Sequence, residues 1–525
     1  GMGFYEAELN GRRVGEKLLD PAPTAYDKRV LYSTYVLDEA VGQGANTLKL
    51  TFGHGWYDCR SVAVWNWNMA PWRNSPRGLA ELRLEYADGS VETVGTDASW
   101  MMASTRTLYD CIREGEVMGA PKPTDGFRAQ EVKGPAGRLE GEILPPTKVM
   151  ETIKPERICR LADGSWLVTF PKNLAGWIRL RLKKNVPGDV VSIRYDERAV
   201  SEKQPEIDTY LLGDRRPPGA WPVPGAIGRR IDQHFLNAAS HHVVAKDAAF
   251  QCDRIIAEGG EKVYEPRFTY NGFRYVWIRG YKGELTSADV TACLVHNAFR
   301  TTGSFVCSDA MLNRLIDMAV LSYKCNYVNG YPTDCPHREK NGWTGDAQLA
   351  ANLAQFCFDN TASYEKWLRD LVDAQRPSGA LPGIAPTSGW GYDDYGPGWD
   401  SALSVIPNEL LVYQEDRQIV REVYPSVLRL LRYTAKRADA DNLVDYGLGD
   451  WCPVDEAHMP TRRFTSSCWY ADMQDKCARF AELSGDGDIA VEMRRGAERT
   501  RTALHNAFHK GNGVYDNGGQ TAQAM

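Results

Sequence analysis

The apolar residues of this 525-residue chain change their spacing near residue 300. Before that point they alternate with polar residues in short runs, and Asn-Gly or Asp-Gly pairs follow some of these runs. The clearest runs span residues 5–9, 48–52, 82–86, 177–182, 190–195 and 275–279. Alternation with a period of two, broken by such pairs, predicts antiparallel strands joined by tight turns. The first 300 residues are therefore expected to form β-sandwiches.

Beyond residue 300 the apolar residues recur three and four positions apart, which predicts helices. The first set is Met311, Leu312, Leu315, Ile316, Ala319 and Tyr323. Ser308 precedes it as the expected N-cap. Further helices are predicted at about 344–358, 361–375, 400–414, 421–438, 466–484 and 487–509. We therefore predict an all-α domain that begins between residues 298 and 310, while periodicity alone does not tell a bundle from a toroid.

The length of the chain exceeds what one hydrophobic core supports, so about three domains are expected. The Pro145-Pro146 pair ends the first β region. The Pro- and Gly-rich stretch 216–228 predicts a long surface loop inside the second. The predicted domains are 1–147, 148–300 and 301–525.

Composition excludes several classes of partner. The formal charge is −6 and no basic run occurs, so nucleic acid and anionic membranes are not expected to bind. The chain has no stretch of 18 apolar residues, so no membrane span is predicted. It does not begin with a basic region followed by an apolar core, so no signal peptide is predicted. Localisation stays open: cytoplasmic, or periplasmic or secreted if a leader was removed. The twelve cysteines form no Cys-x-x-Cys pair and no local framework, which argues against structural zinc and against a disulfide scaffold. Neither a metal nor a cofactor is predicted.

The stretch 334–346 concentrates the chemistry of the chain. It holds Asp334, Arg338, Glu339, Trp343 and Asp346 within thirteen residues, where one helix is expected to end and another to begin. Glycoside hydrolysis needs a carboxylic acid to protonate the leaving oxygen, and polar groups to hold ring hydroxyls. It also uses an aromatic face against the apolar side of the sugar. The cluster therefore predicts a sugar-cleaving site.

Plainer interpretations of the same residues are a charged helix entrance or a thiol nucleophile. In the first, Thr344 is the N-cap and Asp346 complements the helix dipole from the first turn. Cys335 lacks the His and Asn partners of a thiol protease, so a nucleophilic role is weakly supported. His337 is expected to be a hydrogen-bonding neighbour rather than a base.

The run Asp-Cys-Pro-x-Arg-Glu followed by Gly-Trp-Thr-Gly-Asp resembles the signature of the bacterial α-L-rhamnosidases. Other stretches that look like landmarks of this family, in its order, are 53–57, 173–177, 268–275 and 449–451. The resemblance implies an N-terminal β-sandwich at 1–147, which is a candidate carbohydrate-binding module. It implies a concanavalin-like β-sandwich at 148–300 and, at 301–525, the first part of an (α/α)₆ barrel that is incomplete in this chain.

The resemblance also implies the roles of the site residues in an inverting hydrolysis of terminal α-L-rhamnosyl groups. Glu339 matches the general acid. The neighbouring cations Arg338 and Lys340 would lower the pKa of Glu339. Burial and the like charges of Asp334 and Asp346 are expected to outweigh them and to raise it. The substrate-binding residues implied are Asp334, Arg338, Trp343, Asp346, Trp399 and Trp451. The tryptophans are expected to face the C6 methyl of rhamnose, which is a 6-deoxy sugar.

The second carboxylate of an inverting enzyme activates water. The resemblance implies a downstream Glu, and the sequence stops at Met525, so we expect the general base to be missing and the activity of this chain alone to be doubtful. Other acids in the loops between helices are candidate sugar ligands: Asp393, Asp394, Asp400, Asp450, Asp455 and Glu456. If the chain is fully active, Asp400, Asp450 and Asp455 are the first candidates for the base.

The expected partner is a rhamnose-containing glycan or glycoside. The alternatives are a rhamnose-binding homologue without catalysis, another all-α-barrel glycosidase, or a polysaccharide lyase. The aglycone, the linkage preference and the oligomeric state are not predicted.

Overall fold

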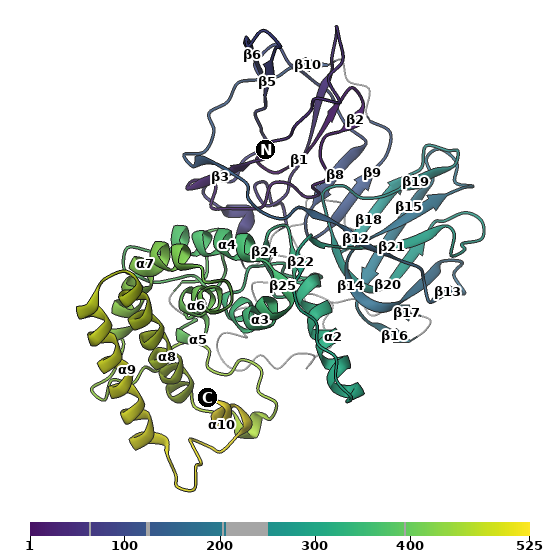
Figure 1. The fold of residues 1–525 in the computed structure, drawn as a ribbon. Helices are drawn as coiled ribbons and strands as arrows, with labels where there is room; N and C mark the ends of the chain where they lie inside the picture. The colour runs from purple at the N-terminus through teal and green to yellow at the C-terminus, as the bar shows by residue number, and fades with distance from the viewer. Residues whose placement is uncertain (62–64, 122–125, 202–203, 206–249, 393–394) are drawn as a thin grey trace.

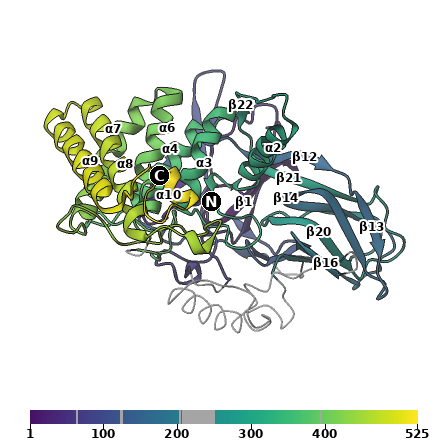
Figure 2. The ribbon, with the colours of Figure 1, turned by 90° about the horizontal axis from the view of Figure 1, so that it is seen from below.

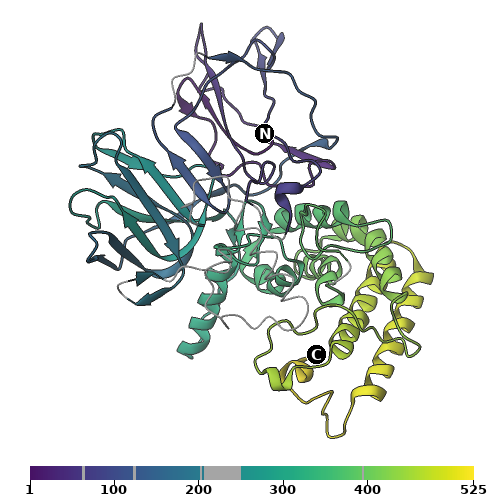
Figure 3. The same ribbon diagram turned by 180° about the vertical axis from the view of Figure 1, so that it is seen from behind.

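The computed structural model describes residues 1–525 except 62–64, 122–125, 202–203, 206–249 and 393–394. The surface loop predicted at 216–228 lies outside the described residues. Figure 1 shows an N-terminal β region, a large twisted sheet and a helical region that meet near β22, β24 and β25. Figure 2 shows the same arrangement from below, and Figure 3 shows it from behind. Helices α7, α8 and α9 lie at the end remote from the large sheet.

The N-terminal region is built from small sheets of two or three strands. β1 pairs antiparallel with both β2 and β4, β5 with β6, and β7 with β10, whereas β3 pairs parallel with β11. The strands are β1 (Phe4–Leu9), β2 (Arg12–Arg13), β3 (Arg29–Tyr32), β4 (Leu48–Gly53), β5 (Glu81–Glu85), β6 (Val91–Gly95), β7 (Met101–Met102), β10 (Phe127–Arg128) and β11 (Arg138–Gly141). The turns predicted at 10–11 and 88–89 join β1 to β2 and β5 to β6, so these hairpins are confirmed.

The large sheet has ten strands, eight of them in the order β12-β21-β14-β20-β15-β18-β9-β8, with β13 and β19 paired to β14. The strands are β8 (Thr107–Cys111), β9 (Gly115–Met118), β12 (Thr147–Ile153), β13 (Arg157–Arg160), β14 (Trp166–Leu182), β15 (Val190–Asp196), β18 (Cys252–Ile256), β19 (Lys262–Tyr264), β20 (Asn271–Arg279) and β21 (Val290–Asn297). A separate pair is β16 (Ala199–Ser201) with β17 (Gln204–Pro205). β8 and β9 precede residue 147, so strands from both sides of the predicted boundary share this sheet.

The central strand β14 explains why the sheet is stable. Val168, Phe170, Leu174, Ile178 and Leu180 are fully buried along it. Each such side chain contributes about 1.5–3 kcal/mol by leaving water. The predicted strands at 177–182, 190–195 and 275–279 fall within β14, β15 and β20, which confirms them.

The described α-helices begin where the spacing of the apolar residues changes. They are α2 (Ala310–Cys325), α3 (Thr344–Cys357), α4 (Thr361–Ala374), α5 (Pro397–Asp400), α6 (Ala402–Gln414), α7 (Arg417–Ala435), α8 (Arg462–Leu483), α9 (Gly487–Phe508) and α10 (Gln520–Ala524). The short elements in the connecting loops are η1 (Trp67–Met69), η4 (Glu456–His458), β22 (Arg300–Thr301), β23 (Tyr327–Val328), β24 (Tyr331–Pro332) and β25 (Phe358–Asp359). The predicted helical domain is therefore confirmed, and each strand described after residue 310 is two residues long.

The first helix is capped one residue later than predicted. Asp309, not Ser308, is the N-cap of α2, and its carboxylate accepts hydrogen bonds from the backbone of Met311 and Leu312. Both residue types cap helices well, so composition does not choose between them. The choice depends on which residue has the extended backbone at the turn, and this is Asp309.

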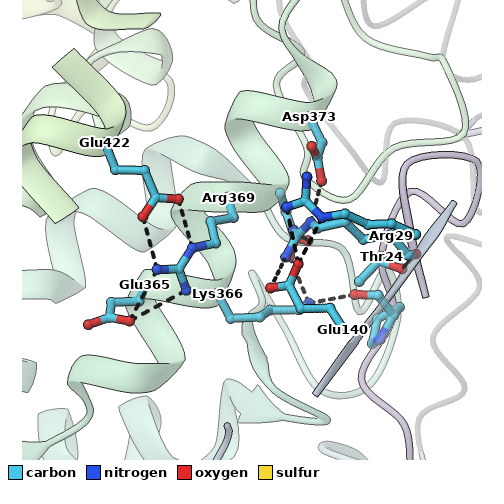
Figure 4. Close-up of polar contacts among 11 residues, drawn as sticks. Thr24, Arg29, Glu140, Glu365, Lys366, Arg369, Asp373 and Glu422 are labelled. Carbon is cyan, nitrogen blue, oxygen red and sulfur yellow. Dashed lines mark hydrogen bonds and ion pairs between the residues drawn. The ribbon is translucent and has the colours of Figure 1, made fainter. Parts of the chain in front are cut away.

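A buried ion network joins the N-terminal region to α4 (Figure 4). Arg29 of β3 is 1% exposed, and its Nη2 lies 2.6 Å from Asp370 Oδ1, while its Nε bonds Asp373. Lys366 Nζ lies 2.7 Å from the other oxygen of Asp370 and donates to the carbonyl of Pro23. These charges are shielded from water, so the two regions are held together by paired rather than exposed ions. Among the described residues, no helix has both the length and the apolar character needed to cross a membrane.

Candidate active site

The stretch 334–343, here called the acid loop, connects β24 to the start of α3. Its ends are tied together, because Asp334 N donates to Asn341 O at 3.2 Å and Asn341 N donates to Asp334 Oδ1 at 3.2 Å. Gly342 adjoins residue 385 so closely that a Cβ atom would lie 2.0 Å from the Ala385 carbonyl oxygen. The loop therefore has one tightly specified path.

Glu339 lies inside this loop with its carboxylate held by an indole. Trp343 Nε1 donates to Glu339 Oε2 at 2.6 Å. Burial raises the pKa of Glu339, and the charge of Asp346 raises it further, against the Trp343 hydrogen bond and the cations Arg338 and Arg113. As expected from the sequence, burial outweighs the neighbouring cations. A carboxyl group whose pKa is raised holds its proton longer, which suits a general acid.

Asp334 lies beside a thiol that contacts both it and the Glu339 backbone. Cys335 Sγ donates to Asp334 Oδ2 at 3.0 Å and accepts from Glu339 N at 3.4 Å. Burial and the charges of Glu339 and Asp346 hold the pKa of Asp334 well above its usual range. Burial and the charge of Asp334 likewise raise the pKa of Cys335 well above its usual range, so the thiol is neutral. This agrees with the weak support that the sequence gives to a nucleophilic cysteine.

Asp346 stands in the first turn of α3, as the helix-entrance interpretation predicted. Its side chain reaches solvent, yet surrounding protein desolvates it and raises the pKa of its carboxyl to about 6. The same interpretation was wrong about the cap: the N-cap is Trp343, which has no capping side-chain bond, and the Thr344 hydroxyl is buried without a hydrogen-bond partner among the described residues. The backbone bond from Thr344 N to Gly383 O, 2.9 Å long, fixes the helix start instead.

Trp343 is surrounded by two aromatic residues that the sequence analysis missed. Its ring centroid lies 6.1 Å from that of Trp390 and 5.3 Å from that of Tyr395, both edge to face. Trp390 and Tyr395 are themselves 5.9 Å apart. The signal that could have indicated this loop is the glycine on each side of Trp390, since flanking glycines mark a turn.

The other two predicted tryptophans lie in different parts of the helical domain. Trp399 in α5 packs so closely on Gly345 that a Cβ atom there would lie 2.8 Å from the indole. Trp451 lies between α7 and α8 and is 43% exposed. The pKa of its neighbour Cys452 is raised by burial and by the charges of Asp450 and Asp346.

Glu197, which the sequence analysis also missed, directly follows β15 of the large sheet. Its Oε2 lies 3.3 Å from His337 Nδ1, in the acid loop. Burial raises the pKa of Glu197, but the His337 hydrogen bond and the charges of His337 and Arg338 lower it further, so the net direction is down. His337 is thus a hydrogen-bonding neighbour, as predicted. No spacing in the sequence connects residues 197 and 337, so this contact had no local signal.

The other acidic residues that were predicted as sugar ligands have different surroundings in the structure. Asp455 caps η4 and bonds His458 at 2.6 Å on an exposed surface, whereas Asp450 Oδ2 accepts from the Thr521 hydroxyl at 2.6 Å. Asp400 is buried in α5. Asp393 and Asp394 lie outside the described residues. In the part of the chain that is described, no three His, Cys, Asp or Glu side chains are arranged to hold a metal ion.

Paired helices follow two β regions, and carboxyls and indoles gather where α3 begins. Three family models match successive parts of the chain. They describe the α-L-rhamnosidase N-terminal domain (residues 1–143), the bacterial α-L-rhamnosidase concanavalin-like domain (159–296) and the bacterial α-L-rhamnosidase six-hairpin glycosidase domain (300–525). The chain belongs to the bacterial α-L-rhamnosidase family.

Individual relatives agree with this assignment. An α-L-rhamnosidase of Streptomyces avermitilis is 29% identical over 539 residues, which cover 100% of this chain and 48% of the relative. One of Formosa agariphila is 27% identical over 553 residues, covering 97% and 53%.

Solved structures of relatives have the same fold. The crystal structure of the Streptomyces avermitilis enzyme complexed with L-rhamnose has a TM-score of 0.84 at 28% identity, covering 99% of this chain and 48% of that one. The α-L-rhamnosidase from Dictyoglumus thermophilum has a TM-score of 0.82 at 28% identity, covering 98% and 54%. The chain spans about half the length of these relatives.

Proposed function

We propose that this chain carries the acid side of an inverting α-L-rhamnosidase site and acts on terminal α-L-rhamnosyl groups of a glycan or glycoside. The observation that carries the proposal is the Glu339 carboxyl, whose pKa burial raises while the Trp343 indole holds one of its oxygens at 2.6 Å. The sugar is supported by the relative whose structure contains L-rhamnose.

In this mechanism Glu339 protonates the glycosidic oxygen as the bond to the anomeric carbon breaks. Oε2 already accepts from Trp343, so Oε1 is the oxygen that carries the transferable proton. The bonding electrons leave with the aglycone oxygen, and water then attacks the opposite face of the oxocarbenium-like carbon, which inverts its configuration. A second carboxylate removes the proton of that water. Asp400, Asp450 and Asp455 are the candidates for this base among the described residues.

The other site residues would bind the sugar ring. Asp334, Arg338 and Asp346 are the proposed ligands of the ring hydroxyls. The charges of Arg338 and Asp346 suit this role, because charge-assisted hydrogen bonds are short and directional. Trp343, Trp399 and Trp451 are the proposed wall for the C6 methyl. Trp390 and Tyr395 support Trp343 from the side, so they would keep its face in place.

The test is Glu339→Gln, which keeps the shape of the side chain and removes the transferable proton. For a glycoside with a poor leaving group the rate is expected to fall by about 10² to 10⁴. The loss is expected to be smaller for an aryl rhamnoside whose leaving group needs little protonation, and rhamnose binding is expected to survive. Glu422→Gln is the control, because Glu422 pairs with Arg369 on the surface of the helical region (Figure 4).

If Glu339→Gln lowered the rate equally for both substrates, this result would contradict the general-acid role of Glu339. Rhamnose binding without turnover of either substrate by the unsubstituted protein would favour the non-catalytic alternative.

A further inference from the structure

The acid loop is held by a residue from the N-terminal side of the chain, Arg113. Arg113 lies in the turn between β8 and β9 and is 1% exposed. Its Nε donates to the Glu339 carbonyl oxygen at 3.1 Å, and its Nη2 donates to Asn341 Oδ1 at 3.1 Å. Its Nη1 donates to Ser61 Oγ at 3.1 Å. The guanidinium therefore contacts the acid loop on both sides of residue 340.

Two indoles fix the plane of this guanidinium. Its central carbon lies 4.8 Å from the ring centroid of Trp56 and 5.0 Å from that of Trp65. Trp67 Nε1 donates to the same Asn341 oxygen at 3.0 Å. A planar cation stacked on aromatic rings and bound through three nitrogens has little freedom to move, which a lysine ammonium would not reproduce.

The residue between the two contact points is anchored as well. Lys340 is fully buried and has a left-handed backbone with φ +54°. Its Nζ donates to the carbonyl of Ile112 at 2.6 Å and to that of Tyr270, and it lies 4.4 Å from the Tyr270 ring centroid. A non-glycine residue holds such a backbone only where its surroundings impose it. Residues 112 and 113 therefore bind the acid loop at three successive positions, 339 to 341.

We propose that Arg113 is a positioning residue for the general acid, so that the β region outside the helical domain sets where the Glu339 carboxyl points. The backbone of Glu339 is held by Arg113, and its carboxylate is held by Trp343 from within the helical domain. Loss of either contact moves the acid relative to the glycosidic oxygen. This rests on the proposed function of Glu339.

The kinetic test compares Arg113→Gln and Arg113→Lys with Arg29→Gln. Arg29 is the matched control, because it is also a buried arginine that joins the N-terminal region to the helical domain, but it bonds α4. A misplaced acid costs up to about 10² in rate, so kcat for a poor leaving group is expected to fall roughly ten- to hundredfold in both Arg113 variants, with KM nearly unchanged. In the Glu339→Gln background, Arg113→Gln is expected to add almost no further loss, because the two residues act as one unit.

The pH profile separates charge from geometry. Arg113→Gln removes a cation that favours the ionised acid, so the alkaline limb of activity is expected to move to higher pH. Arg113→Lys keeps the charge and is expected to leave that limb in place while still lowering kcat. The proposal would be overturned if kcat fell equally in Arg29→Gln and in the Arg113 variants. It would also be overturned if the losses of kcat from Arg113→Gln and Glu339→Gln were additive.

Amide hydrogen exchange tests the same idea without turnover. Arg113→Gln is expected to speed exchange in peptides covering 334–343, and Arg29→Gln is expected to leave those peptides protected. If Glu339→Gln does not alter turnover, the proposed function fails and exchange alone decides about Arg113. If residues 334–343 exchange as slowly in both Arg113 variants as in the unsubstituted protein, Arg113 is not a positioning residue. If Arg113→Gln does not fold, Arg113→Lys is used for this measurement.

Discussion

Replacing Trp343 by Phe tests whether the indole hydrogen bond tunes the general acid. Phe keeps an aromatic ring beside Trp390 and Tyr395 but has no N–H to donate to Glu339 Oε2, which now accepts at 2.6 Å. The bond favours the ionised carboxylate and therefore lowers the pKa of Glu339. Its removal is expected to raise that pKa beyond its already raised position.

The size of the shift follows from the bond. A hydrogen bond to a charged group is worth about 1.5–3 kcal/mol, and one pKa unit corresponds to about 1.36 kcal/mol. Trp343→Phe is therefore expected to disfavour the ionised carboxylate of Glu339 by about 1.5–3 kcal/mol, which raises its pKa.

The assay is the pH dependence of kcat/KM for an α-L-rhamnoside with a poor leaving group. A general acid must be protonated, so activity falls as pH rises through its pKa. In Trp343→Phe this alkaline limb is expected to move to higher pH. Trp390→Phe is the control, because Trp390 contacts Trp343 rather than Glu339. An unmoved limb, or one moved to lower pH, would refute the assigned hydrogen bond.

Three other outcomes are expected. Asp370→Asn leaves Lys366 buried without its carboxylate and removes one of the carboxylates paired with Arg29. The free energy of unfolding is therefore expected to fall by about 3–5 kcal/mol in urea titrations, whereas Glu422→Gln is expected to lower it by less than about 1 kcal/mol. Rhamnose affinity, measured by calorimetry, is expected to weaken as pH falls through about 6, because protonation of Asp346 removes a charged acceptor, and this dependence is expected to vanish in Asp346→Asn. If the indoles face the C6 methyl, α-L-rhamnosides are expected to be favoured over α-L-mannosides by about 1–3 kcal/mol in kcat/KM, and equal values would remove that wall.

Local features of the sequence determined much of this protein. The change from a period of two to helical spacing predicted the start of the helical domain, because backbone periodicity is set by residues only a few positions apart. The cluster from Asp334 to Asp346 was visible for the same reason, since its carboxyls and indole are neighbours along the chain. The raised pKa of Glu339 also followed from a simple argument, because burial of a carboxyl outweighs adjacent cations.

Tertiary structure decided what surrounds that cluster. Arg113, Glu197, Trp390 and Tyr395 reach the acid loop from distant parts of the chain, and no spacing connects them to it. The pairing of β9 with β18 depends in the same way on how separate regions pack together. Side chains distant in sequence meet only when the chain closes long loops to bury apolar surface. The sequence therefore indicates which groups can do the chemistry, and the packing of the β regions on the helices determines which partners orient them.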